Sequence, residues 1–195
     1  MRQLPLACES GAVRGYNLST MAIIGIIGAD DRAVAIGRMI RRTGHTVCFS
    51  DLNDDRTSQA AAEALGDGAY ATTPYQQAAS CDTLLLATHW EDVDRALTAL
   101  GDYKDGVLVD ATRPPDLGRL SGAELLAHKL DNRHVVKGFV EPPDEDDFIR
   151  IASDDPQARA EVGELIACCG RSALDVGPLA NARTIERVVA DHLVR

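Results

Sequence analysis

The sequence predicts a single α/β domain of the Rossmann-like, doubly wound kind, with a mostly parallel sheet. Three observations lead to this prediction. From residue 21 onward, short apolar runs alternate with segments of helical period. Several of the runs are apolar almost without interruption, which is typical of strands buried on both faces of a sheet. Strands and helices alternate along this whole region, which favours parallel strands joined by right-handed crossovers.

The strongest strand signal is the run AIIGII at residues 22–27. Further strands are expected at residues 45–50, 82–87, 106–110, 134–140, 147–152 and 172–176. Helices are expected between them, at residues 31–43, 56–65, 74–80, 90–100, 121–130, 155–169 and 178–194. Gly44, Gly101 and Gly170 are placed to end three of these helices. Ser121 with Glu124 has the spacing of a capping box at the start of another.

Composition narrows the function classes. The 195 residues are 45% apolar and 26% charged, which suits one folded domain and excludes a disordered chain. The formal charge of −10 disfavours nucleic acids and anionic membranes as partners. No apolar run reaches the roughly 20 residues that span a bilayer. The five cysteines show neither a disulfide framework nor zinc-ligand spacing, so we expect a soluble, cytoplasmic protein in a reducing compartment.

Residues 1–20 differ from the rest of the chain. They lack a sustained period and the apolar core of a signal peptide, so we expect a flexible N-terminal extension with Met21 as the natural start. Residues 21–195 then form the Rossmann-type, NAD(P)-binding domain. The acidic stretch 141–147 is interpreted as a solvated connector between two strands, and no metal site is expected.

The first strand, turn and helix partly match a dinucleotide fingerprint. Gly28 provides the tight turn, Ala29 follows it, and Ala33 is small enough for the helix to pack on the strand. Asp30 stands where the second glycine belongs, and its carboxylate would crowd a pyrophosphate at the helix N-terminus. Arg32 is placed to compensate by pairing with an acid or with a phosphate.

The second strand ends at Ser50-Asp51, 18 residues after Ala33. Near this spacing an acidic residue meets the adenosine ribose hydroxyls, and an acid there favours NAD over NADP. The alternative is that residues 51–55 form only a polar turn and helix cap.

Six motifs resemble one family of small oxidoreductases. They are Ile24-Gly25-Ile26-Ile27-Gly28-Ala29, Thr43-Gly44-His45, Leu86-Ala87-Thr88-His89-Trp90, Val109-Asp110-Ala111-Thr112 with Pro114, Val135-Val136-Lys137-Gly138-Phe139, and the run from Asp175 to Arg183. The chain is similar here to the NADP-dependent reductases that exchange hydride between NADP and the deazaflavin coenzyme F420. The resemblance runs from Met21 to about Arg187. It implies one Rossmann-type domain, often homodimeric, in which cofactor and substrate meet above the strand ends.

The departures from the family pattern fall at ligand-facing positions. Besides Asp30 and Ala33, the chain has Asp51 where the family places an arginine that grips the NADP phosphate. Thr88-His89 replaces Val-Pro, while Arg113 and Val140 each replace an asparagine. This pattern predicts a retained fold with altered or lost activity.

Five further residues are candidates for the site. Thr88, His89 and Trp90 would flank the nicotinamide, with His89 as a general acid or ribose ligand, or only a helix cap; Trp90 is alternatively a packing anchor. Arg113 is expected to clamp an anion or to form a surface ion pair. Lys137 is expected to reach a strand end or an acidic partner, because burying it unpaired would be costly.

The sequence thus supports two hypotheses. The first is an oxidoreductase that binds NAD or NADP, NAD being slightly favoured, and transfers hydride to a small-molecule or deazaflavin acceptor. Arg113, Lys137 and Val140 would lie on the substrate side. The second is a noncatalytic dinucleotide- or metabolite-binding protein on the same scaffold, which Asp30 favours.

Overall fold

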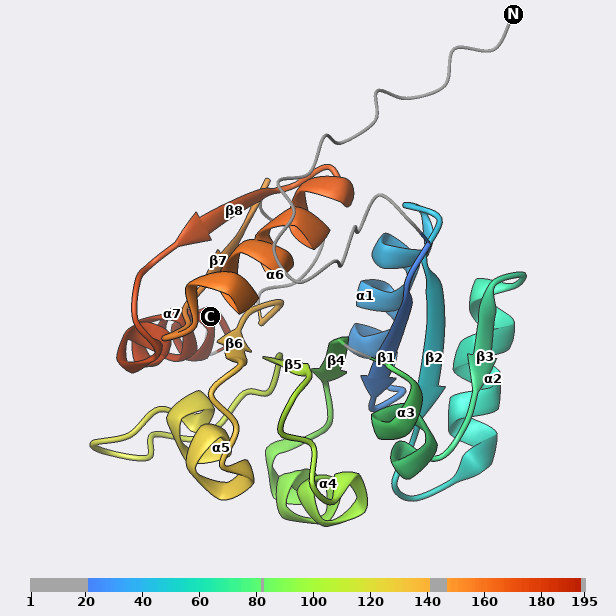
Figure 1. The fold of residues 1–195 in the computed structure, drawn as a ribbon, viewed down its shortest axis with the longest axis horizontal. Helices are drawn as coiled ribbons and strands as arrows, with labels where there is room; N and C mark the ends of the chain where they lie inside the picture. Colours follow the sequence, from blue (N-terminus) through green and yellow to red (C-terminus); the bar gives the residue numbers. More distant parts are fainter. Residues whose placement is uncertain (1–20, 82, 141–146, 194–195) are drawn as a thin grey trace, which may run out of the picture.

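The computed structural model describes residues 21–81, 83–140 and 147–193 of the chain. Six parallel strands form its main sheet in the order β3-β2-β1-β4-β5-β6 (Figure 1). Their bounds are β1 Ile23–Ile27, β2 Thr46–Ser50, β3 Ala69–Ala71, β4 Thr83–Leu86, β5 Val107–Asp110 and β6 Val135–Lys137. This is the strand order of a Rossmann fold, so the predicted fold class is confirmed.

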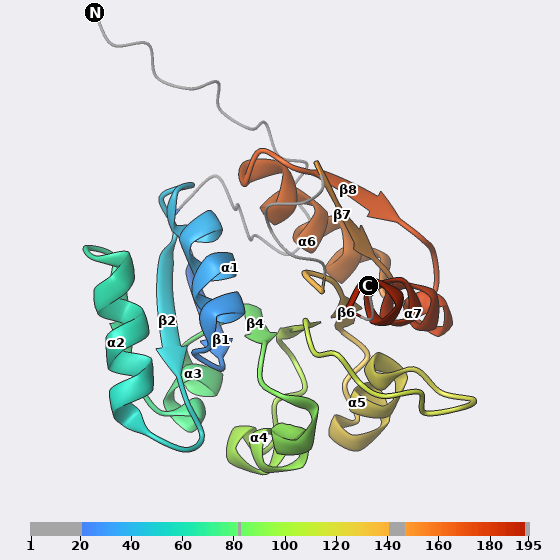
Figure 2. The ribbon, with the colours of Figure 1, turned by 180° about the vertical axis from the view of Figure 1, so that it is seen from behind.

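Helices cover both faces of this sheet (Figures 1 and 2). They are α1 Asp31–Arg41, α2 Asp55–Leu65, α3 Pro74–Ser80, α4 Val93–Leu100, α5 Gly122–Leu130, α6 Pro156–Cys168 and α7 Ala182–Leu193. The predicted helices are thus all present. Short 3₁₀ turns, Trp90–Asp92 and Leu179–Asn181, precede α4 and α7.

The core forms two layers because side chains alternate across each strand. In β4, Leu85 packs in a cluster with residues of α1, α2 and α6. Leu84 and Leu86 pack in a second cluster with residues of α4, α5 and α7. All three leucines are wholly buried. A strand that is buried on both faces reads as an uninterrupted apolar run, which is why β4 was recognisable in the sequence.

Strand β3 is the one element of the main sheet that the sequence analysis did not predict. It has three residues, Ala69 to Ala71, and pairs with β2 at the edge of the sheet. Two alanines flanking an exposed tyrosine give no sustained apolar run. Pairing with β2 therefore defines this strand more than its own sequence does.

The last two strands do not extend the main sheet. β7 (Phe148–Ile151) and β8 (Ser172–Asp175) pair in parallel as a separate sheet, with α6 as their crossover. A single antiparallel bridge, between Lys137 and Ala152, joins β7 to the end of β6. A parallel crossover needs a dozen or more residues, usually a helix, whereas β6 and β7 are joined by the shorter segment 138–147. The direction of β7 therefore reverses.

The N-terminal extension and most of the acidic connector, residues 1–20 and 141–146, lie outside the described residues. Within the described part of the chain, no helix is long and apolar enough to cross a bilayer.

Candidate functional site

Small residues form a ledge along the carboxyl edge of the sheet. Gly28, Ala87, Ala111 and Gly138 follow β1, β4, β5 and β6, and each donates its backbone N–H to the neighbouring strand. The N···O distances are 2.8 Å for Gly28 to Ser50, 2.8 Å for Ala87 to Ile27, 3.0 Å for Ala111 to Leu86 and 3.1 Å for Gly138 to Asp110. Ligands of open α/β sheets bind at this edge, where strand order reverses between β1 and β4.

Gly28 shapes the turn at the centre of this ledge. Its φ is +112°, and a Cβ at this position would lie 2.7 Å from the carbonyl oxygen of Ala87. Both the backbone conformation and the close approach exclude other residues. The tight turn that the sequence predicted at Gly28 is therefore present, directly before α1.

Asp30 caps the N-terminus of α1. Its Oδ1 accepts a hydrogen bond of 2.8 Å from the backbone N–H of Ala33, as an N-cap side chain does. In dinucleotide-binding folds this end of the helix receives the pyrophosphate. The Asp30 carboxylate therefore accepts a hydrogen bond that a ligand phosphate would otherwise accept.

The guanidinium of Arg32 lies across the ledge. It donates to the carbonyl oxygen of Ala111, and through Nη2 to that of Ala87 at 3.2 Å. Burial lowers the pKa of Arg32, and the nearby positive charge of Arg113 lowers it further, while Asp30 and Asp110 raise it. Arg32 was expected to pair with an acid or a phosphate, and its direct partners are instead the carbonyls at the ends of β4 and β5.

Ser50 and Asp51 end β2 beside the ledge. The Ser50 hydroxyl is wholly buried and donates to Oε1 of Gln77 at 3.1 Å, while Gln77 Nε2 donates to the carbonyl oxygen of Cys48 at 2.7 Å. Asp51 is partly exposed, and its Oδ1 accepts from the backbone of Asn53 at 2.8 Å. The polar turn expected at Asp51 is thus present. Because Ser50 is buried, the Asp51 carboxylate is the group of the two that a ribose could contact.

Thr88, His89 and Trp90 follow β4 in order. Thr88 is buried, His89 is exposed, and His89 precedes the 3₁₀ turn without capping it through its side chain. Trp90 is half-buried and packs against the second core cluster, near Gly122 at the start of α5. The anchor role of Trp90 is therefore visible in the structure, and His89 is the side chain of the three that faces solvent.

Arg113 and Val140 join the ends of β5 and β6. The Arg113 guanidinium donates to the carbonyl oxygen of Val140, at 3.2 Å from Nε and 2.8 Å from Nη2. The Val140 side chain itself is wholly buried. Next to it, the buried Phe139 has a φ of +56°, a strained conformation for such a residue.

Lys137 lies beneath this corner of the ledge in a buried ion network. Its ammonium group donates to Asp110 Oδ2 at 2.8 Å, to the carbonyl oxygen of Thr112 at 2.8 Å and to Glu186 Oε1 at 3.2 Å. Lys137 and Asp110 are wholly buried. Burial raises the pKa of Glu186, and the charge of Lys137 opposes that rise. Of the two placements expected for Lys137, the structure shows the acidic partner.

Two of these contacts were missed in the sequence. Gln77 lies on α3 and ties β2 from inside the fold, and Glu186 reaches the strand end from α7. Neither belongs to a recognisable motif. The one available signal for Glu186 was the lysine on an apolar strand, which required an acid from elsewhere in the chain.

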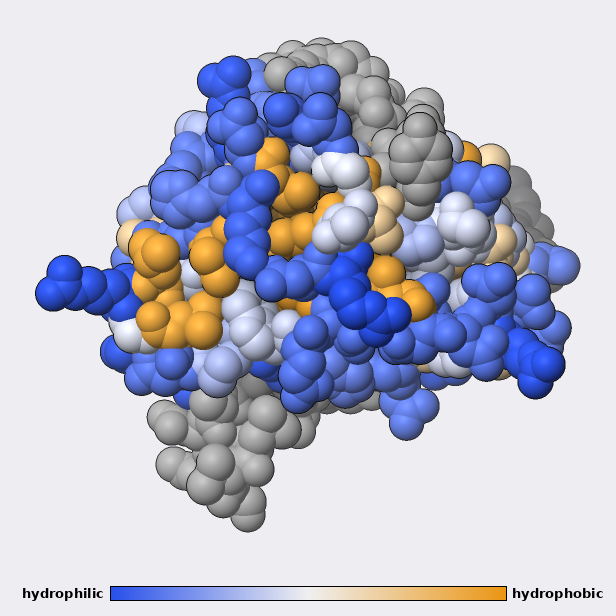
Figure 3. All heavy atoms as spheres, turned by 90° about the horizontal axis from the view of Figure 1, so that it is seen from below, coloured by the Kyte–Doolittle hydropathy of each residue, from blue (hydrophilic) through white to orange (hydrophobic). Residues whose placement is uncertain are grey.

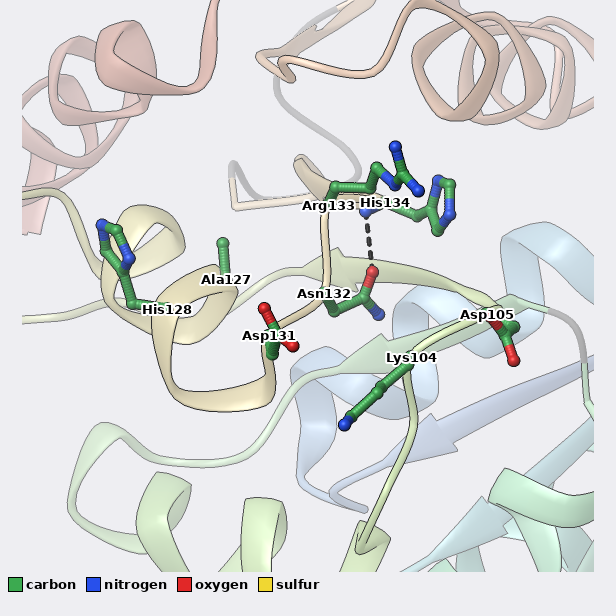
Figure 4. Close-up of a pocket in the computed structure, with 8 residues that line it drawn as sticks. All are labelled: Lys104, Asp105, Ala127, His128, Asp131, Asn132, Arg133 and His134. Atoms are coloured by element: carbon green, nitrogen blue, oxygen red, sulfur yellow. Dashed lines mark hydrogen bonds between the residues drawn. The ribbon is translucent and has the colours of Figure 1, made fainter.

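A cavity of about 510 Å³ lies at the opposite edge of the sheet (Figure 4). Its lining residues come from the segment before β5 and from α5 and the segment leading into β6: Lys104, Asp105, Ala127, His128, Asp131, Asn132, Arg133 and His134. Lysine and arginine are balanced here by two aspartates, so the lining selects no ligand charge. The cavity is also remote from the carboxyl edge where the fold binds ligands.

At this edge, His134 Nδ1 pairs with Asp155 Oδ2, and Asp155 also caps α6 by accepting from Gln157 N–H at 2.8 Å. Burial raises the pKa of Asp155, but hydrogen bonds from His134 and from the α6 backbone outweigh it, so the net shift is downward from 3.8. A carboxyl group whose pKa is lower in the folded than in the unfolded protein stabilises the fold at pH above its unfolded pKa. This contribution is lost as pH falls through its folded pKa.

We therefore expect Asp155→Asn to lower the melting temperature at pH 6, with the difference from the parent shrinking as pH falls from about 3.8 through the lower folded pKa. Asparagine keeps the cap, so the change tests the charge alone. The control is Asp54→Asn, the same exchange at the N-cap of α2, where the described residues place no histidine. A difference for Asp155→Asn that stays constant down to pH 2.5 would contradict the assignment.

Strand order, the turn at Gly28 and the helix that starts at the ledge define a Rossmann-type α/β protein. Comparison with known proteins adds a match to one family over part of the chain. Residues 23–114 match the model of the family described as NADP oxidoreductase, coenzyme F420-dependent. The resemblance inferred from the sequence motifs is thereby confirmed, and Asp30 makes the glycine fingerprint of this chain a degenerate one.

Individual proteins are also similar to this chain. Metalloreductase STEAP3 of Rattus norvegicus is 27% identical over 179 residues, covering 85% of this chain and 36% of that protein. The chain thus spans about a third of the length of this curated relative. A proposed F420-dependent NADP reductase from Arthrobacter sp. FB24 superposes with a TM-score of 0.73 at 20% identity, covering 87% of this chain and 91% of the other.

A reductive aminase from Aspergillus terreus, in complex with NADPH and ethyl levulinate, superposes with a TM-score of 0.70 at 18% identity. The match covers 90% of this chain and 62% of the aminase. These structural likenesses show that the Rossmann-like fold is shared.

Proposed function

We propose that the chain is an oxidoreductase that binds a nicotinamide dinucleotide along the ledge and transfers hydride to or from a second small molecule. The observation that carries the proposal is the turn at Gly28, where the backbone approaches Ala87 too closely for any side chain. The family match covers this turn, and the similar proteins named above are reductases. Hydride transfer between two bound rings needs mainly positioning, so a strong acid–base pair is not required.

In this proposal, Gly28, Ala29 and the start of α1 hold the pyrophosphate, and Asp51 accepts from the adenosine ribose. Thr88 and His89 flank the nicotinamide side. The preference is for NAD, because a carboxylate at Asp51 repels the extra phosphate of NADP. The related imine reductases include complexes with NAD+ and with NADP+, so the fold itself accommodates either cofactor.

The second molecule would enter near Arg113 and Val140. Figure 3 views the side toward which β1 and β2 point in Figure 1, and hydrophobic residues lie exposed among hydrophilic ones there. A deazaflavin is the acceptor that the family suggests. We further propose a homodimer, as the family resemblance implies. We place it in a reducing, cytoplasmic compartment, since the spacing of the five cysteines shows no disulfide framework. Light scattering would then give twice the 20.9 kDa chain mass.

A second candidate function is favoured by Asp30 and Arg32, which place side chains of this chain on the ledge and at the helix N-terminus. A protein that has this scaffold but transfers no hydride would keep the contacts that hold the sheet together. It would not need a ledge free of the Arg32 and Asp30 side chains. Hydride transfer requires a bound cofactor, so a failure to bind any nicotinamide dinucleotide would favour this second, noncatalytic protein.

The test is a thermal-shift titration of the full chain against NAD, NADH, NADP and NADPH. A ligand at about 100 times its Kd stabilises a fold by about 2.7 kcal/mol, or about 5–10 °C here. We expect a shift with NAD(H) and a smaller one with NADP(H). Asp51→Arg restores the family's phosphate-gripping arginine and should reverse that order. No shift with any of the four would favour the noncatalytic protein.

A further inference from the structure

One arginine of α4 ties together the loops that follow β2 and β4. Arg95 Nη1 donates to Asn53 Oδ1 and to Asp92 Oδ1, each at 2.8 Å, and Nη2 donates to the carbonyl oxygen of Leu52 at 3.1 Å. Leu52 and Asn53 follow β2, and Asp92 ends the 3₁₀ turn that follows β4. Because β1 lies between β2 and β4 in the sheet, the guanidinium group joins the loops on either side of the turn at Gly28.

These contacts of Arg95 fix the position of its guanidinium group more than they stabilise the fold. The side chain is 56% exposed, and its ion pair with Asp92 spans only three residues along the chain. An exposed pair of this kind contributes little to stability, and ordering a long side chain costs conformational entropy. What the three hydrogen bonds achieve is one defined orientation of a flat, charged group at the carboxyl edge of the sheet.

The flat faces of this group are left unused by its hydrogen bonds. The N–H groups of a guanidinium point outward within its plane, so the three acceptors lie around the edge of the Arg95 group. A guanidinium face stacks on aromatic rings, with the positive charge over the ring. Arg95 therefore offers a partly exposed platform for a flat ring.

The proposed function brings such a ring close to Arg95. In that function Asp51 accepts from the adenosine ribose, and the adenine is bonded to the ribose carbon next to the one that carries the 2′-hydroxyl. Asp51 Oδ1 also accepts from the backbone N–H groups of Asn53 at 2.8 Å and Asp54 at 3.2 Å, so the turn folds back on this carboxylate. Leu52 packs against the core cluster that includes α4, which holds the turn against the helix that carries Arg95.

The local charge favours an uncharged ring over a phosphate. Asp92 pairs with the Arg95 guanidinium, and Asp51 places a second carboxylate beside the residues that Arg95 contacts. Two carboxylates outweigh one guanidinium, so the 2′-phosphate of NADP meets no net positive charge here.

We propose that Arg95 is the platform on which the adenine ring of the nicotinamide dinucleotide stacks. This inference rests on the proposed function and adds to it the residue that holds the adenine. Arg95 has no part in hydride transfer, which takes place at the other end of the cofactor. It determines affinity for the dinucleotide.

The test is calorimetric titration of the full chain with NADH. We expect Arg95→Leu to weaken binding by about 3- to 30-fold, as loss of a cation–π contact does. Arg95→Tyr loses all three hydrogen bonds to the loops but restores a flat face, so it should recover most of that loss. The matched control is Arg159→Leu, which removes another ion-paired arginine, 3.3 Å from Asp175, and should leave the affinity unchanged.

Two results would overturn the platform while leaving the proposed function intact, because in both the parent still binds NADH. One is equal affinity in the parent and in Arg95→Leu. The other is an equal loss in Arg95→Leu and Arg95→Tyr, which would show that Arg95 acts only by tying the loops. A parent that binds no NADH overturns the proposed function and the platform together. The melting temperature of each variant, measured alongside, confirms that it is folded.

Discussion

Lys137→Met is expected to lower the free energy of unfolding by about 3–5 kcal/mol, the largest stability effect of any single change considered for this fold. Lys137 is wholly buried and lies between Asp110 and Glu186. Methionine fills a similar volume but leaves both carboxylates without the ammonium group. Removing one partner of a buried ion network costs far more than the network contributes when it is complete.

The variant should also show a specific pH dependence. Burial already raises the pKa of Glu186 while Lys137 restrains it, so without Lys137 that pKa rises further. A carboxyl whose folded pKa exceeds its unfolded value stabilises the fold at low pH, and this contribution is lost as pH rises through the folded value. Urea unfolding should therefore show a smaller penalty for Lys137→Met at pH 5 than at pH 8.

The control is Lys129→Met, the same exchange in an exposed ion pair between α5 and Asp94. An exposed pair is worth at most about 1 kcal/mol. Lys137→Met/Glu186→Gln should recover part of the lost stability, because it removes one of the two unmatched carboxylates. If Lys137→Met is no more destabilising than Lys129→Met, the network is not the source of stability that its burial implies.

The network also shows where sequence reasoning ends. The cost of burying a charge predicted that Lys137, on an apolar strand, would reach a strand end or an acidic partner. The sequence did not indicate Glu186 as a partner, because it comes from α7, 49 residues further along the chain. Arg183, three residues before Glu186 on the same helix, donates instead to the carbonyl oxygen of Gly118.

The fold itself was more readily predicted than its site. Strands such as β1 and β4 are buried on both faces over most of their length, so their sequences are mainly apolar and local patterns reveal them. β3 depends on pairing with β2 and left no such pattern. Arg32 shows the same limit at the site, because its partners are backbone carbonyls at the ends of two other strands. Backbone carbonyls are present at every residue, so no sequence motif marks them.

Asp30→Gly is expected to tighten NADH binding by about 10- to 100-fold. The Asp30 carboxylate accepts from the N–H of Ala33 at the start of α1, at 2.8 Å. A glycine frees that N–H for a phosphate oxygen, and a hydrogen bond to a charged group contributes about 1.5–3 kcal/mol. It also removes a negative charge from the end of the helix that favours anions. Glycine is itself an acceptable N-cap, so the cost in stability is only a few tenths of a kcal/mol.

Asp30→Asn separates charge from shape. Asparagine keeps the size and the capping oxygen but loses the charge, so electrostatic repulsion alone would let it recover much of the gain. If only glycine tightens binding, the side chain obstructs the pyrophosphate by its bulk. Calorimetric titration with NADH, with the melting temperature of each variant measured alongside, distinguishes these cases. Should the parent bind NADH tightly and both variants bind it more weakly, Asp30 contacts the ligand, and the helix N-terminus of this chain receives a dinucleotide through its aspartate rather than in spite of it.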